Sequence, residues 1–213
     1  MALRKQVFAP GEYYHLYNRG TEKRIIFLDQ QDYYHFLFLM YICNTEKSIT
    51  LRSVGNGEFF EPGETIIDIG AFCLMPNHFH ILVHEKIENG ISKYMRKLLT
   101  GYSMYFNKKY KRTGKLYEGV FKSTHANKDT YLKYLYSYIH LNPAKLVDKN
   151  WREKRGQATT KLLHYVLRYP YSSIKEYQSG KFKIINPIQF PNYFKKPIDH
   201  KNELFEWLSA DPF

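Results

Sequence analysis

The chain has 213 residues, and its 44% hydrophobic and 24% charged residues are typical of a globular chain, which excludes a disordered one. Its two cysteines, Cys43 and Cys73, are too few for a disulfide framework and fit a reducing compartment. No apolar stretch is long enough to span a membrane, and the first residues lack the apolar core of a signal peptide. We therefore expect a cytoplasmic protein with no membrane partner.

The net charge of +12 is unevenly distributed along the chain. Residues 1–100 carry as many acidic as basic side chains, so the whole excess lies in residues 101–213. A confined excess favours binding to a polyanion, most often nucleic acid, although a solvated lysine-rich surface explains it equally well. Aromatic and basic residues are mixed in YSMYFNKKYKRTGKLY at 102–117. Such a mixture suits the unpaired bases of a single strand, whereas most of the phenylalanines fit a core.

Apolar periodicity and turn residues predict the elements of the first half of the chain. They are a strand over 13–18, a helix over 29–43 capped by Asp29 or Asp32, a hairpin over 48–60, and strands over 65–75 and 78–85 joined by a Pro-Asn turn.

The second half of the chain is predicted to be mainly helical. In chain order we expect a basic amphipathic helix over 91–110 with Ser92 as a candidate cap, a basic loop over 111–119, a helix from Asn127 or Asp129 to about Leu141, a short helix over 161–167, and an irregular Pro-rich tail. Strands and helices in this order predict a compact α+β fold, with an antiparallel sheet that carries its helices on one side.

The most specific short motif is His78-Phe79-His80, which follows the Pro-Asn turn. Residues i and i+2 of a strand share a face, so the two imidazoles project together. The opposite face, directed to the core, carries Phe79, Ile81 and Val83. Two adjacent imidazoles can bind one divalent metal ion, but the pair alone leaves a metal site and a structural role equally open. The alternate histidines of the histidine-triad nucleotide hydrolases are a weak match, because the third position is Leu82.

A second motif lies on the helix predicted from YLKYLYSYIHLNP at 131–143. At 100° per residue, Tyr131, Tyr138 and Asn142 fall within a narrow arc beside Leu135. Tyr138 and Asn142 are neighbours at i and i+4, an arrangement that a metal-assisted tyrosine nucleophile needs. The other explanation is that the tyrosines simply pack against the sheet. The same winding turns three side chains away from this arc: Lys133, Ser137 and His140.

Five ordered segments resemble the single-tyrosine transposases that carry an HUH motif, of the insertion-sequence and REP-associated (RAYT) type. The segments are YHLYNRG with IFLDQQDYYHFL in 14–37, MPNHFHILV at 75–83, NKKYKRTGKLYEGVFKS at 107–123, YSYIHLNPAKLV at 136–147, and YPYSSIKEY at 169–177. Three departures are a valine at position 120, where the family often has an arginine, a long hairpin over 48–60, and the tail after residue 178.

The resemblance implies a ferredoxin-like (RNA-recognition-like) α+β fold, with a catalytic domain over 1–177 and a Pro-rich, basic C-terminal extension over 178–213. It implies Tyr138 as the nucleophile and His78, His80 and, less directly, Asn142 as ligands of Mg²⁺ or Mn²⁺. The expected partner is single-stranded or hairpin DNA, near the nucleoid of a prokaryote, and a homodimer stays open. We assign DNA contacts to seven basic residues: Arg19, Lys108, Lys109, Lys111, Arg112, Lys115 and Lys122.

Two other functions fit parts of the sequence. A non-catalytic binder of single-stranded nucleic acid would explain the basic half and the aromatic residues, but not paired histidines together with a Tyr–Asn face. A metal-dependent phosphodiesterase that activates water would use the histidines, but would not need Tyr138.

Overall fold

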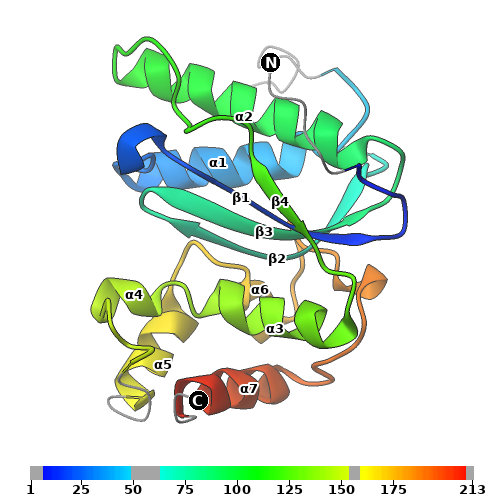
Figure 1. The fold of residues 1–213 in the computed structure, drawn as a ribbon, viewed down its shortest axis with the longest axis vertical. Helices are drawn as coiled ribbons and strands as arrows, with labels where there is room; N and C mark the ends of the chain where they lie inside the picture. The colour runs from blue at the N-terminus through cyan, green and yellow to red at the C-terminus, as the bar shows by residue number, and fades with distance from the viewer. Residues whose placement is uncertain (1–6, 49–62, 154–158, 210–213) are drawn as a thin grey trace.

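The computed structural model describes residues 7–48, 63–153 and 159–209. Four strands form one antiparallel sheet in the order β2-β3-β1-β4 (Figure 1). Their bounds are Tyr13–Arg19 (β1), Ile67–Met75 (β2), His78–Glu85 (β3) and Lys122–His125 (β4). The hairpin predicted over 48–60 lies, apart from its first residue, outside the described part of the chain.

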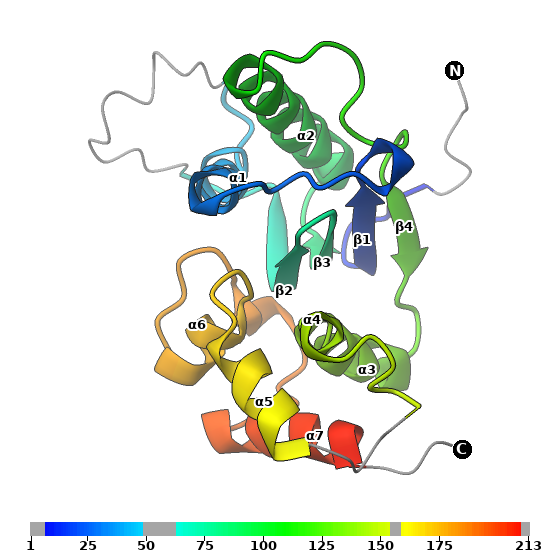
Figure 2. The ribbon, with the colours of Figure 1, turned by 90° about the vertical axis from the view of Figure 1, so that its left-hand side faces the viewer.

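Helices cover both faces of this sheet, which corrects the expectation that they pack on one side (Figure 2). One face carries α1 (Gln30–Ile42) and α2 (Gly90–Lys109). The other face carries α3 (Asp129–His140), with α4 (Ala144–Val147), α5 (Thr159–Arg168), α6 (Ile174–Ser179) and α7 (Pro197–Ser209) around it. Two short 3-10 helices are η1 (Thr21–Lys23) and η2 (Pro187–Gln189). The strand order and the placement of α1 and α2 are those of the predicted ferredoxin-like fold.

The alternation of side chains along β3 separates the main core from the functional face. Phe79, Ile81 and Val83 are fully buried in the core formed with α1 and α2. His78 and His80 therefore face the opposite layer, as the i and i+2 spacing predicts.

The helix α3 covers only half of that opposite face. Its apolar stripe, with Leu132, Leu135 and Ile139, packs in a second core with Cys73 and Leu82 of β2 and β3. The part of the face formed by β1 and β4 is not sealed by this core, so an opening remains beside the histidines.

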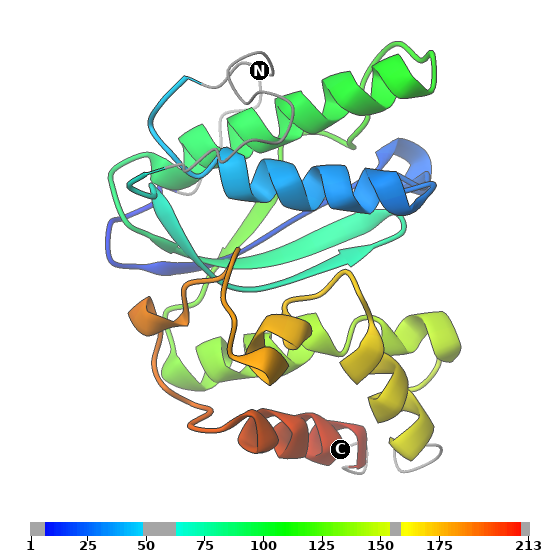
Figure 3. The same cartoon turned by 180° about the vertical axis from the view of Figure 1, so that it is seen from behind.

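The C-terminal segment protects the edge strand β2. The backbone N–H of Leu74 donates to the carbonyl of Tyr171 at 2.9 Å, and Ser173 N–H donates to Phe72 O at 3.0 Å. Further on, the segment shown in orange in Figure 3 returns to the sheet, and Asn186 N–H donates to Ile69 O at 2.8 Å. These bonds satisfy backbone groups that an open edge would expose to pairing with another chain.

Several local predictions fail for identifiable reasons. Ser92 is not a cap, because α2 begins at Gly90 after Asn89 in the left-handed conformation. The strand β4 was not predicted, because KSTH lacks apolar alternation. The tail expected to be irregular contains α7, which packs against α3 and α5. No helix in the described ranges is long and apolar enough to cross a membrane.

The predicted cap of α1 is correct, and it leads to a buried charge cluster. Asp29 and Asp32 form a reciprocal capping box, in which each side chain accepts the other's backbone N–H. Asp32 is fully buried, and Lys109 of α2 donates to it at 2.8 Å while also pairing with Asp29. Burial lowers the pKa of Lys109. The hydrogen bonds that its ammonium donates to these carboxylates raise the pKa by more, so the net shift is upward. The lysine therefore links α2 to α1.

We predict that Lys109→Met lowers the free energy of unfolding by about 3 kcal/mol, because it leaves the buried Asp32 without its cation. Lys108→Met, at the exposed neighbouring position, is the control and should change it by less than about 0.5 kcal/mol. Urea unfolding followed by circular dichroism measures both values. Equal small effects for the two variants would contradict the structural role of Lys109.

Candidate active site

The antiparallel pairing of β1 with β3 brings the residues of the candidate site together. Arg19 pairs with His78 and Tyr17 pairs with His80, so these four side chains share the face that α3 partly covers. His80 is buried, with 6% of its surface exposed, and Arg19 is exposed. A row of histidine, tyrosine and arginine side chains thus lies beside the opening.

Both predicted metal-binding histidines are held in the neutral form. Burial, with smaller effects of Lys145 and Arg19, lowers the pKa of His78 to about 4. Burial also lowers the pKa of His80 well below its ordinary value, reinforced by His15, His78 and the same two cations. A neutral imidazole is the form that binds a metal ion.

Hydrogen bonds orient the two imidazoles. Nδ1 of His78 lies 2.6 Å from Oδ1 of Asn77, and because a carbonyl oxygen can only accept, Nδ1 is the donor. The lone pair of His78 is then on Nε2. Nδ1 of His80 lies 2.9 Å from Nε2 of His15, a buried residue of β1. If Nδ1 of His80 donates to His15, its Nε2 likewise carries the lone pair, which is the usual arrangement behind a metal-binding histidine.

Tyr138 of α3 faces the histidines across the opening. Its ring centroid lies 5.4 Å from that of His80 and 5.7 Å from that of His15, edge-on in both cases. Burial raises the pKa of the Tyr138 hydroxyl, and the Arg152 guanidinium, 5.4 Å above its ring, lowers it in part. The hydroxyl therefore needs further stabilisation before it can act as a phenolate.

Asn142 lies just beyond the end of α3, the helix that carries Tyr138. Its side-chain amide donates to the carbonyl of Tyr138 at 2.8 Å, while its Oδ1 is buried and has no hydrogen-bond partner in the described chain. A buried carbonyl oxygen without a partner is costly unless a ligand satisfies it.

These observations test whether a divalent metal ion fits the residues. Within the described part of the chain, no group of three or more His, Cys, Asp or Glu side chains is arranged so that these residues alone could hold a metal ion. The predicted donors are two neutral imidazoles and the Oδ1 of Asn142, which is buried and has no hydrogen-bond partner among the described residues. Nitrogen and amide-oxygen donors are compatible with a first-row or alkaline-earth divalent ion, so the set fits the expected group.

Three cations surround the histidine end of the site. Lys145, on the short helix α4, is half-buried, and its pKa is lowered by burial and by Arg152 and Arg19. Lys145 and Arg152 belong to the basic segment 145–161, which the sequence predicts to hold the DNA backbone, but no local pattern distinguishes either as an individual site residue. His15 and Tyr17 were also missed, although reading YYHLYN as a strand already puts them on one face.

The seven basic residues assigned to DNA binding fall into two groups. Arg19 lies opposite His78, and Lys122 lies opposite Tyr17 on β4, so both are exposed on the face of the site. The others lie at the end of α2 or in the loop after it: Lys108, Lys109, Lys111, Arg112 and Lys115. In this second group Lys109 binds Asp29 and Asp32, and Arg112 donates to Asn107 at 3.0 Å.

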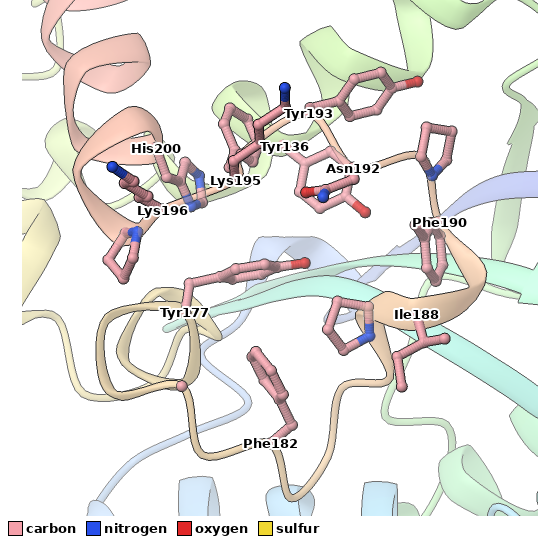
Figure 4. Close-up of a pocket in the computed structure, with 15 residues that line it drawn as sticks. Tyr136, Tyr177, Phe182, Ile188, Phe190, Asn192, Tyr193, Lys195, Lys196 and His200 are labelled. Carbon is pink, nitrogen blue, oxygen red and sulfur yellow. The ribbon is translucent and has the colours of Figure 1, made fainter.

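Two larger cavities adjoin α3, and a small one of about 80 Å³ lies between Tyr138, Arg152 and Trp207. A cavity of about 320 Å³ lies between α3 and the strands β1 and β4, and both His80 and Tyr138 line it. A cavity of about 400 Å³ lies on the far side of α3, within the C-terminal segment (Figure 4). Aromatic rings such as Tyr136, Tyr177 and Phe190 line this second cavity, and none of the predicted site residues does. We therefore assign the chemistry to the cavity of about 320 Å³, which both His80 and Tyr138 line.

The prediction that Ser137 and His140 point away from the tyrosine arc needs a qualification, since neither is exposed. His140 is fully buried, and its ring nitrogens contact His200 of α7 at 3.1 Å and Ser173 at 2.7 Å. The C-terminal segment thus covers the back of the helix that carries Tyr138, a role that the sequence did not reveal.

The structure thus combines an α+β fold, built on a four-stranded antiparallel sheet, with paired histidines that face a tyrosine on a helix. Residues 63–142 match the family model described as "Transposase IS200 like", and this range contains His78, His80, Tyr138 and Asn142. Over this range the chain is similar to the IS200-like transposases, in agreement with the resemblance that the sequence motifs indicate.

The fold is also similar to that of a REP-associated tyrosine transposase whose structure was solved bound to a REP hairpin. The TM-score is 0.52 at 15% sequence identity, and the alignment covers 90% of this chain and 96% of that chain. At this identity the likeness shows the fold. No curated protein sequence matches the chain.

We predict that His15→Phe lowers the free energy of unfolding by about 1–3 kcal/mol, because Nδ1 of His80 loses its buried partner. Nitrogen-15 NMR of the imidazoles should show that His80 no longer has one fixed tautomer. His35→Phe on α1, where the ring contacts Tyr105 and Phe38 and lies far from the site, is the control and should leave His80 unchanged. An unaltered His80 spectrum in His15→Phe would contradict this role.

Proposed function

We propose that this protein is a DNA-processing enzyme that cuts and rejoins single-stranded DNA at hairpin sequences through a covalent bond to Tyr138. The observation that carries the proposal is the position of the Tyr138 ring, 5.4 Å from His80 in a sheet face that also presents His78. The family match over residues 63–142 supports a transposase, and the REP hairpin bound in the similar structure supports a hairpin substrate.

In the proposed reaction the Tyr138 oxygen attacks the scissile phosphorus in line. A bond forms between that oxygen and phosphorus, the bond from phosphorus to the 3′ oxygen breaks with its electron pair going to that oxygen, and the 3′ oxygen takes up a proton from solvent to become a hydroxyl. The phenol proton passes to solvent or to a neighbouring base. The product is a 5′-phosphotyrosine, which conserves the energy of the broken ester, so that another 3′-hydroxyl can reverse the step without ATP.

His78, His80 and Asn142 would hold the divalent ion in this scheme. When bound, Mg²⁺ or Mn²⁺ would polarise the phosphate and offset its negative charge. The chain's own cations act in the same direction. Arg152 stabilises phenolate character on Tyr138, and Lys145 with Arg19 adds positive charge where a phosphate would lie beside His78.

The two alternative functions differ from this proposal in what Tyr138 does. A binding module would not need a tyrosine beside paired neutral histidines, and a water-activating phosphodiesterase would leave no protein–DNA bond. The Tyr138 hydroxyl, which has no hydrogen-bond partner among the described residues, lies next to these histidines and favours the covalent route.

We predict that Tyr138→Phe abolishes covalent attachment while hairpin binding changes less than about threefold, because the hydroxyl has no hydrogen bond within the described chain to lose. The test incubates hairpin DNA labelled at its 3′ end, taken from repeats beside the gene, with protein and Mn²⁺ on a denaturing gel. The wild type and the control Tyr165→Phe should give a labelled band at protein size, and a chelator should remove it. Cleavage without attachment in the wild type would favour the hydrolase, and binding without cleavage the binding module.

We predict that Arg152→Gln slows attachment roughly three- to tenfold at neutral pH and shifts the rising limb of the pH–rate profile to higher pH. Burial already raises the pKa of Tyr138, and the variant removes the cation that lowers it, so a higher pH is needed for the same phenolate fraction. Single-turnover rates between pH 6 and pH 10 measure this shift. A uniformly lower rate with an unmoved profile would assign Arg152 to DNA binding alone.

A further inference from the structure

The cavity of about 320 Å³ on the β1/β4 side of Tyr138 has an unusual lining. Four tyrosines surround it. Tyr131, Tyr134 and Tyr138 come from one face of α3, and Tyr17 comes from β1. The remaining lining residues are His15, His80, Thr124 and Leu135. At this volume the cavity takes a small ring system, because ligand pockets begin at about 300 Å³.

The tyrosines offer both ring surfaces and free hydroxyls to an occupant. The ring centroids of Tyr134 and Tyr138 lie 5.8 Å apart, and those of Tyr131 and Tyr134 lie 6.1 Å apart in a stacked arrangement. None of the four hydroxyls has a hydrogen-bond partner in the described part of the chain. The lining therefore suits a flat, polar aromatic ligand that stacks on rings and exchanges hydrogen bonds at its edge.

Charge separates this cavity from the place where a phosphate would bind. Within the described chain, no Lys, Arg, Asp or Glu lines the cavity. The cations act instead at the histidine end, since Lys145 and Arg19 both affect His78. A neutral aromatic cavity beside a cationic site matches the two parts of a nucleotide, whose base is neutral and whose phosphate is anionic.

We propose that this cavity holds the unpaired nucleobase of a nucleotide that adjoins the cleaved phosphate. The base stacks against Tyr134 and Tyr17, while Tyr138 attacks the phosphate beside it. Lys122, exposed and directly opposite Tyr17 on β4, lies on the same face and contacts the next backbone phosphate. The inference rests on the proposed DNA cleavage and adds to it a base-binding site formed by α3, β1 and β4.

The test places 2-aminopurine, a base whose fluorescence is quenched by stacking, at each of the two nucleotides that flank the cut in a hairpin DNA. Tyr138→Phe protein is used so that the DNA stays intact, and binding is followed independently by anisotropy. At one of the two positions we expect quenching on binding, which Tyr134→Leu and Tyr17→Leu abolish. An abasic site at that position should weaken binding about tenfold, because stacking on an aromatic side chain contributes that much or more.

Three variants control the experiment. Tyr134→Phe keeps the ring and should retain quenching. Tyr34→Leu changes an exposed tyrosine on α1, across the sheet, and should behave as the parent. Tyr17→Leu is independent of Tyr134→Leu, which also removes a ring contact with Trp207 of α7.

The outcomes separate this inference from the proposed function. Binding and covalent attachment without quenching at either position, or with quenching that survives both leucine variants, would overturn the base site and leave DNA cleavage intact. Absence of covalent attachment in the wild type would overturn the proposed reaction, while quenching that depends on Tyr134 would still support the base site. Absence of hairpin binding would overturn both.

Discussion

The antiparallel pairing of β1 with β3 is the interaction on which the candidate site depends. It places Arg19 opposite His78 and Tyr17 opposite His80, and it brings Nε2 of His15 within 2.9 Å of Nδ1 of His80. A shift of this register by one residue would turn all these side chains into the core with α1 and α2. The apolar residues that alternate with them on both strands make such a shift costly, so the core indirectly holds the site in place.

The second constraint is the position of α3, which closes one side of the site and leaves the other open. Its apolar stripe packs on β2 and β3, and this directs Tyr138 toward His80 while Tyr131 and Tyr134 border the cavity over β1 and β4. The same helix is supported from behind by α7 and by the buried contact of His140 with Ser173. A nucleophile on a helix packed on both sides loses little freedom when substrate binds.

The basic residues behind the net charge of +12 serve two different roles in the structure. Part of the basic excess is structural, as Lys109 shows by linking α1 to α2 through Asp29 and Asp32. Another part, with Arg19 and Lys122, borders the candidate site on the face that α3 leaves open. Net charge therefore indicates the class of partner, whereas the contact surface has to be taken from the residues that share a face.

The sequence by itself determined the strand that carries His78 and His80 and the helix that carries Tyr138, and it narrowed the cap of α1 to Asp29 or Asp32. These follow from local periods of two and 3.6 residues and from capping chemistry. Only the tertiary structure decided that His15 contacts His80, that Arg152 lies over Tyr138, and that four tyrosines enclose one cavity. Each of these depends on register or packing between segments far apart in the chain, for which local periodicity carries no signal.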